Sequence, residues 1–239
     1  MKKRDLILII IISGISGFML VYQQINTLPP SMLDVAIAQL GSLEMLLFVG
    51  VIQIIVMTLI AYGVGSVLAP KTNLKVSFVF ERDVFIKVII MSCVVALLNT
   101  GLEWFVFQPY LGELQPYQFS WTFFIASLLY GGIIEEILLR FGVLTLIVWL
   151  TQKILRSDHV GTYIFAVVIS SLIFALGHLP AASVIFGLSL IIVIRILLLN
   201  FVPGLLFGWL YWKYGLCYSM LSHVLVHVFT QIIFLPILF

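Results

Sequence analysis

Long apolar runs separated by short polar stretches dominate the chain and predict a series of membrane-spanning helices. These runs cover approximately residues 6–22, 43–68, 84–98, 120–155, 162–179, 183–199, 201–212 and 216–239. The hydrocarbon core of a bilayer is about 30 Å thick, so one span needs about 20 mainly apolar residues. The pattern therefore predicts an all-α protein, a polytopic transmembrane bundle of about seven or eight membrane helices.

Some of these runs carry further information. The run 120–155 is too long for one simple span, so we expect it to tilt, to break or to extend past the membrane surface. Pro180 should end the run 162–179, and Pro203 should open the short segment 201–212. The first run is longer than the apolar region of a usual signal peptide and has no obvious cleavage site, so we expect a retained first helix.

Composition makes the bilayer the main solvent of this chain. Its 239 residues are 63% hydrophobic and 9% charged, whereas a soluble domain is about 25% charged. We therefore expect membrane lipid as a partner and no soluble domain. The net charge of +2 gives no reason to expect nucleic acid as a partner. Cys93 and Cys217 lie in apolar runs and are expected to be small buried residues rather than metal ligands or a disulfide.

The basic residues between the runs predict an orientation. They form three groups that are separated by two spans each: Lys2, Lys3 and Arg4; Lys71, Lys75 and Arg82; and Lys153 and Arg156. The loops on the other side contain almost no Lys or Arg. Because cytoplasmic loops are enriched in these residues, we expect an integral protein of the cell (plasma) membrane with a cytoplasmic N-terminus.

Ionisable residues inside the apolar runs are the candidates for chemistry. Each such residue costs about 2.5–3.5 kcal/mol on insertion scales, so it is a functional candidate by default. The residues of this kind are Glu135, Glu136, Arg140, His178, Arg195, His223 and His227. All of them except Arg195 fall into three short clusters, and convergence of these clusters in one pocket is the simplest way to satisfy them all.

The first cluster contains two adjacent glutamates and an arginine. Glu136 and Arg140 are four residues apart, with the acid on the N-terminal side, which is the favoured order for a helical ion pair. That pair can simply orient the bundle. Glu135 points about 100° away on the helix and lacks a cation on its own helix. Desolvation should raise its pKa, so Glu135 is a candidate general base.

The other two clusters supply imidazoles. His178 follows Phe174 on the same helix face, close to the end of a run. His223 and His227 are four residues apart, so both rings face the same way and can bind a metal. The residues between them contain no glutamate, so a metal site would borrow a carboxylate from another helix, and Glu135 is available.

The order of these motifs resembles the CPBP family. This family contains the type II CAAX prenyl endopeptidases together with bacteriocin-processing and self-immunity membrane proteins. The resemblance covers about half the chain, and the matching residues are Glu135, Glu136, Arg140, Phe174, His178, Phe201, Gly204, Gly208 and His223. The chain departs from the family at His227, where Asn is usual. On this basis 1–118 are expected to form N-terminal transmembrane helices and 119–239 the catalytic core of one integrated bundle.

The resemblance implies an intramembrane endopeptidase that hydrolyses a peptide or membrane-protein substrate without a cofactor. Glu135 and His178 would hold and deprotonate a water, and His223, helped by His227, would stabilise the oxyanion. Glu136 and Arg140 would orient Glu135, or Arg140 would bind a substrate carboxylate. A metal-assisted version would place Zn²⁺ on Glu135, His178 and His223.

Two other classes of protein remain as alternatives to a protease. The chain is either catalytic or a non-catalytic immunity or scaffold protein, and a proton-coupled carrier ranks last because no inverted repeat is visible.

The side of the membrane on which the pocket lies is an open question. Counting residues places Glu135 and His178 at similar distances from the basic turn near Arg156. The positive-inside rule then places the pocket toward the outer leaflet, whereas CAAX processing in the family is cytoplasmic.

Overall fold

Apolar helices make up nearly all of the computed structural model, which describes residues 3–76, 79–111 and 117–238. The helix content is 89%, and the described part contains no strand. Six helices in that part are long and apolar enough to cross a membrane: Arg4–Thr27, Leu43–Lys71, Arg82–Tyr110, Val160–Phe186, Leu190–Tyr214 and Leu216–Leu238. The predicted fold class is confirmed, and the number of spans is close to the expected seven or eight.

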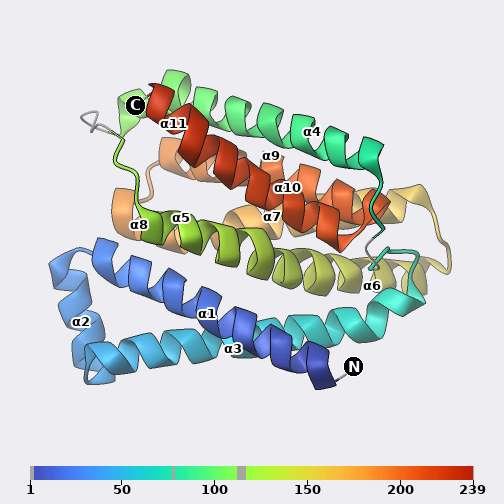
Figure 1. The fold of residues 1–239 in the computed structure, drawn as a ribbon, viewed down its shortest axis with the longest axis horizontal. Coiled ribbons are helices and arrows are strands. Elements are labelled where there is room, and N and C mark those ends of the chain that lie inside the picture. The colour runs from blue at the N-terminus through green and yellow to red at the C-terminus, as the bar shows by residue number, and fades with distance from the viewer. Residues whose placement is uncertain (1–2, 77–78, 112–116, 239) are drawn as a thin grey trace.

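Two groups of helices flank a central helical run (Figure 1). On one side α1 (Lys3–Thr27) packs against α3 (Leu43–Leu68), and the short helix α2 (Pro30–Leu40) connects them. On the other side α4 (Arg82–Leu102) packs against α10 (Leu216–Val228). The expected loop after the first span is thus partly helical, because Pro30 suits the first turn of α2, where no backbone N–H is needed.

The central run is continuous from Trp121 to Leu155 and does not break. It consists of α5 (Trp121–Ala126), the π-helical segments η4 (Ser127–Glu135) and η5 (Ile137–Leu144), and α6 (Thr145–Leu155). At 1.5 Å per residue an α-helix of this length would measure about 50 Å, which exceeds the membrane core. Wider π turns inside a helix occur frequently at functional sites.

Glycines let the neighbouring helices approach the central run closely. A Cβ atom on Gly65 of α3 would lie 2.5 Å from the ring and the carbonyl oxygen of Phe141. On the other side, a Cβ atom on Gly132 would lie 2.3 Å from the Val224 side chain of α10. Such contacts require the absence of a side chain, so these glycines bring three segments of the bundle together.

The runs 183–199 and 201–212 do not form two segments. Instead, α8 (Leu179–Phe186) is a short helix, and α9 (Leu190–Tyr214) continues through Pro203. Proline has no N–H to donate to the carbonyl four residues earlier. The Asn99 side chain of α4 donates to that carbonyl, on Leu199, at 2.7 Å, so the proline is accommodated within the helix.

The helix α9 packs against α7 (Val160–Gly177) through the two glycines of a Gly-x-x-x-Gly pair. Cβ atoms on Gly204 and Gly208 would lie 3.1 Å from side-chain atoms of Ser171 and Val167. Small residues at this spacing allow membrane helices to approach closely. This contact fixes the position of α7 and of the histidine at its end.

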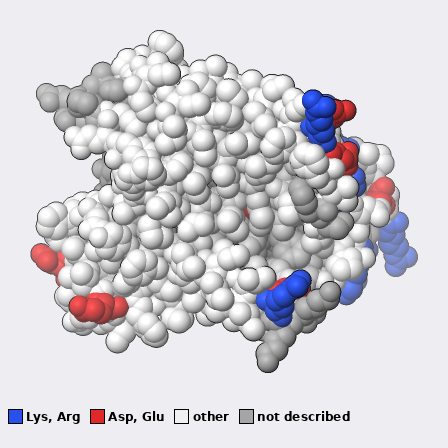
Figure 2. Space-filling model, viewed as in Figure 1, with Lys and Arg blue, Asp and Glu red and all other residues white. Residues whose placement is uncertain are grey.

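Basic residues gather at one end of the bundle, which we call the cationic end. Figure 2 shows Lys and Arg at the end where α6 finishes and α4 begins, while acidic side chains appear at the opposite end. In the described part this end contains Arg4, Lys71, Lys75, Arg82, Lys87, Lys153, Arg156 and Lys213. Lys2, which was also expected there, lies outside the described residues. Cys217, close to this end, is exposed, so its predicted burial is wrong.

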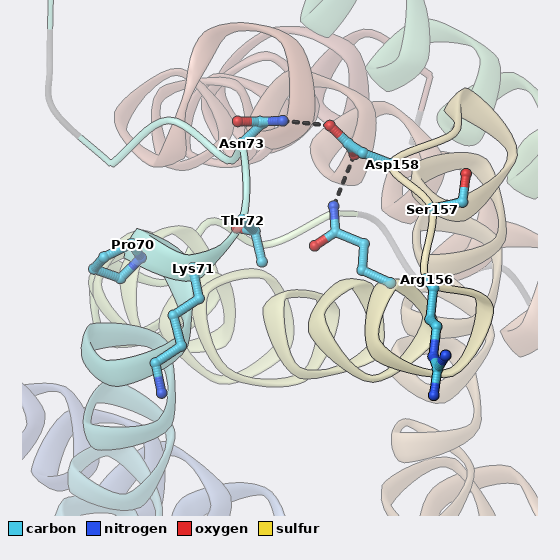
Figure 3. Close-up of a pocket in the computed structure, with 8 residues that line it drawn as sticks. Pro70, Lys71, Thr72, Asn73, Arg156, Ser157 and Asp158 are labelled. Carbon is cyan, nitrogen blue, oxygen red and sulfur yellow. Dashed lines mark hydrogen bonds between the residues drawn. The ribbon is translucent and has the colours of Figure 1, made fainter.

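A polar hollow of about 400 Å³ lies at the cationic end (Figure 3). It is lined by the segment that connects α3 to α4 and by the segment that connects α6 to α7. The Asp158 carboxylate accepts hydrogen bonds there from Asn73, Gln152 and Tyr163. The bond from the Tyr163 hydroxyl is the largest cause that lowers the pKa of Asp158 below its ordinary value. An ionised Asp158 therefore ties the two connections together at neutral pH.

The glycine contacts generate a stability prediction. We expect Gly65→Ala to lower the thermal unfolding temperature in detergent, because the new methyl group overlaps Phe141 and overpacking costs about 1–3 kcal/mol. Gly63→Ala on the same helix is the matched control, since a Cβ atom there meets nothing within 4 Å. Equal unfolding temperatures for the two variants would contradict this account of the close contact.

Candidate active site

Three of the predicted residues meet at one point inside the bundle. Glu135, the last residue of η4, places one carboxylate oxygen 3.9 Å from Nε2 of His178 and the other 3.9 Å from Nε2 of His223. The Glu135 side chain is 15% exposed. The geometric requirement of the sequence-based hypothesis, convergence of these groups from separate helices, is therefore met, while their catalytic roles stay predictions.

The second ring nitrogen of each histidine is anchored. Nδ1 of His178 lies 2.9 Å from the Phe174 carbonyl oxygen, and Nδ1 of His223 lies 2.9 Å from the Glu136 carboxylate. Both partners can only accept a hydrogen bond, so each Nδ1 carries the proton and donates. In the neutral rings the two Nε2 lone pairs therefore face Glu135.

Glu136 is the centre of a fully buried polar network. Its carboxylate accepts hydrogen bonds from His223 and from the Ser219 hydroxyl, and lies 3.4 Å from Nε of Arg140. Both members of this ion pair are 0% exposed, as the spacing on one helix predicted. Arg140 also donates to the Gly204 carbonyl at 3.1 Å, so the pair connects the central run to both α9 and α10.

Aromatic rings enclose this network. The Arg140 guanidinium lies over the rings of Phe174 and Phe207, at 4.8 and 5.5 Å from their centroids. Phe207 also stacks on His223, with the ring centroids 4.2 Å apart. Arg140 is therefore screened from any substrate, and its geometry suits an orienting role rather than the binding of a substrate carboxylate.

His178 and His227 occupy positions that the local backbone permits. His178 is the C-cap residue of α7, and Leu179 and Pro180 start the next helix directly after it. From this position the His178 side chain faces Glu135. The ring of His227 stacks on His223 with ring centroids 5.0 Å apart, and no described residue makes a hydrogen bond with that ring. A Cβ atom on Gly131 would lie 2.7 Å from Nε2 of His227, so this ring fits only beside a glycine.

A cavity of about 290 Å³ extends from the two histidines of α10. Its walls include the aromatic and imidazole side chains of His223, His227, Phe174 and Phe207, and also Glu103 and Arg195. The remaining lining residues are Asn99, Thr100, Leu199, Asn200, Pro203, Val226, Thr230 and Leu235. The site therefore has space for a substrate segment next to the convergent imidazoles.

Sequence reasoning missed several residues of this site. Ser219 shares a helix face with His223, and that spacing was visible in the sequence although its carboxylate partner was not. Arg195, the ionisable residue outside the three clusters, pairs with Glu103, which the sequence did not indicate, at 2.6 Å. These two residues are 92 positions apart, so no local pattern indicates that they meet.

The described residues contain no group of three or more His, Cys, Asp and Glu side chains arranged to hold a metal ion. The chemistry of the donors nevertheless suits one, because ligating histidines typically donate their other N–H to a carboxylate or a backbone carbonyl. Glu135, His178 and His223 are the side chains that would hold such an ion.

The buried network generates a second prediction. We expect Arg140→Met to destabilise the protein by about 3–5 kcal/mol, because the charged Glu136 would lose its arginine partner in an apolar interior. Equilibrium unfolding in detergent measures this loss. The double variant Glu136→Gln/Arg140→Met should recover much of it, since no buried charge is then left alone. A double variant as unstable as the single one would contradict the assignment.

Comparison with known proteins identifies the region that carries this site. Residues 117–229 match the family described as Rce1-like, the type II CAAX prenyl endopeptidases. Searches of curated proteins and of solved structures found no match. The matched region contains Glu135, Glu136, Arg140, His178, His223 and His227. The resemblance predicted from the sequence is thus confirmed: residues 117–229 match the Rce1-like type II CAAX prenyl endopeptidases, which is consistent with a CPBP family intramembrane protease.

Proposed function

We propose that this protein hydrolyses peptide bonds inside the membrane with a water activated by Glu135 and His178. The observation that carries the proposal is the placement of one carboxylate between two imidazole nitrogens, at 3.9 Å from each. These distances are too long for direct hydrogen bonds, and a polar contact of this length is commonly bridged by water. The family match supports a peptide or protein substrate.

The proposed reaction begins when the bridging water attacks the scissile carbonyl carbon. Glu135 accepts a proton from this water, and the new C–O bond forms as the carbonyl becomes an oxyanion. The oxyanion then collapses, the C–N bond breaks, and the proton passes to the leaving nitrogen. One water is consumed, and a carboxylic acid and an amine are produced.

His223 is proposed to stabilise the oxyanion, assisted by His227. With Nδ1–H donated to Glu136, Nε2 of His223 donates only when the ring is an imidazolium. One such donor is worth about 3–4 kcal/mol in known cases. Glu136 and Arg140 are positioning residues in this scheme, because both are fully buried and neither can reach a substrate.

A metal-assisted version uses the same side chains. Glu135, His178 and His223 would hold the ion, which would supply a polarised water for attack. Both versions require the same convergence of groups, and they differ in the response to chelation.

We also propose that the cavity is reached from the non-cytoplasmic side. Glu103, which lines the cavity, lies about 30 Å along α4 from Arg82 at the cationic end, and this distance matches the thickness of the hydrocarbon core. The central run is unbroken, so no break brings the site back toward the cationic end. With the cationic end in the cytoplasm, the part of the cavity that is lined by Glu103, which we call the cavity mouth, lies at the outer leaflet.

The chemistry generates a third prediction. We expect Glu135→Gln and His178→Ala to lower the cleavage rate of a membrane peptide by the purified protein by at least about 100-fold, since general acid–base groups contribute about 10²–10⁴-fold. His159→Ala, a histidine at the cationic end, is the control and should cleave like the parent. Parent-like cleavage by Glu135→Gln and His178→Ala would refute the assignment. Loss of activity with a chelator, restored by Zn²⁺, would favour the metal-assisted version.

Sidedness generates a fourth prediction. In protein whose two cysteines are changed to serine, a membrane-impermeant maleimide should label Asp34→Cys in intact cells, because α2 lies at the end opposite the cationic end. Arg156→Cys should be labelled only after the membrane is permeabilised. The reverse pattern of labelling would place the cavity mouth on the cytoplasmic side.

A further inference from the structure

An ion pair lines the candidate active-site cavity. Nε and Nη2 of Arg195 donate to the two carboxylate oxygens of Glu103 at 2.7 and 2.6 Å. This parallel, two-bond geometry is the strongest form of a guanidinium–carboxylate contact. The Arg195 and Glu103 side chains are only 15% and 17% exposed, so the pair is largely shielded and its charges are balanced.

The same cavity is lined by this pair and by the two histidines of α10. The lining includes Glu103 and Arg195 together with His223 and His227. A peptide segment whose scissile carbonyl lies at His223 would therefore extend along the cavity toward the ion pair. Neither charged residue belongs to the motifs of the catalytic region, and Glu103 lies outside the matched region 117–229.

An acceptor without a partner lies on the same wall. The Nδ2 atom of Asn99 donates to the Leu199 carbonyl, while its Oδ1 atom is buried and has no hydrogen-bond partner in the described part of the protein. Buried polar atoms are nearly always satisfied. An N–H group of a bound peptide, from its backbone or from an amide side chain, is the natural donor for this oxygen.

We infer that Glu103, Arg195 and Asn99 form a substrate subsite that accepts an uncharged residue and rejects a charged one. The inference rests on the proposed protease function. A guanidinium and a carboxylate that already satisfy each other offer no counter-charge to a substrate. A Lys or Glu side chain placed beside them would be buried without compensation, and this penalty excludes it.

Removing one member of the pair should change the preference of the subsite from an uncharged residue to a charged one. Arg195→Gln leaves the Glu103 carboxylate without its cation, so the subsite should then favour a cationic side chain. Glu103→Gln leaves the Arg195 guanidinium free, so the subsite should favour an acidic one. The exchange Glu103→Arg/Arg195→Glu keeps the balance of charge and should keep the preference of the parent.

The test uses three Leu/Ala membrane peptides of about 20 residues. They are identical except for a guest Gln, Lys or Glu, which is moved along the peptide in successive sets. Competition with a fluorescent peptide measures the Kd for each protein in the Glu135→Gln background, and cleavage is measured separately with Glu135 intact. We expect the parent to bind the Gln peptide more tightly than the Lys and Glu peptides at one position of the guest residue. Each single variant should shift the ratio of Kd values by about tenfold, Arg195→Gln in favour of the Lys peptide and Glu103→Gln in favour of the Glu peptide.

The control is the exposed pair Arg4–Asp5, because Asp5→Asn removes an acid far from the cavity and should leave the preference unchanged. Parent protein that binds all three peptides equally at every register, or binds none, overturns the inference even if the single variants fail to fold. Cleavage by the parent without any shift in the variants overturns the subsite and leaves the protease standing. Shifted binding without cleavage supports the subsite and counts against the protease.

Discussion

The Glu136 carboxylate is the interaction on which the organisation of the site depends. In a bundle whose solvent is lipid, a buried charge must find all of its partners within the protein. Glu136 receives Arg140 from its own helix and Ser219 and His223 from α10. Arg140 in turn reaches the Gly204 carbonyl of α9. One carboxylate therefore fixes the relative positions of three segments, and these segments supply or support every group that faces Glu135.

This arrangement requires helices that approach one another unusually closely. Gly131 and Gly132 allow His227 and Val224 of α10 to lie against the backbone of η4, and Gly204 allows α9 to reach α7. The two glutamates are adjacent in sequence, yet they serve different purposes because they project from the helix in different directions. Glu136 is directed into the network that holds the helices, while Glu135 is left facing the two Nε2 atoms. The structural carboxylate and the candidate catalytic carboxylate thus belong to consecutive residues of the chain.

Much of the fold and the core of the site could be predicted from the sequence because both follow from local patterns. Apolar runs mark the spans, and ionisable residues are so rare inside them that each one is informative. The continuous helix α9 was not predicted, because Pro203 is tolerated only through a side chain from α4 that donates to Leu199. The Glu103–Arg195 pair was not predicted for a similar reason. Its members come from distant parts of the chain, and only packing of α9 against the end of α4 brings them together.

The Glu136–Arg140 and Glu103–Arg195 ion pairs differ in a way that bears on function. Glu136 and Arg140 are 0% exposed and sealed beneath Phe174 and Phe207, so their charges act only on the protein itself. Glu103 and Arg195 retain some exposure, and the space they face is the cavity that leads to His223. A balanced pair at such a boundary neutralises both charges without filling the space beside them. An apolar residue in their place would leave no polar surface for a peptide backbone, and a lone charge would select its opposite. The pairing of Glu103 with Arg195 is therefore best understood as part of the cavity wall, and the selectivity of the site follows from its charge balance as much as from its shape.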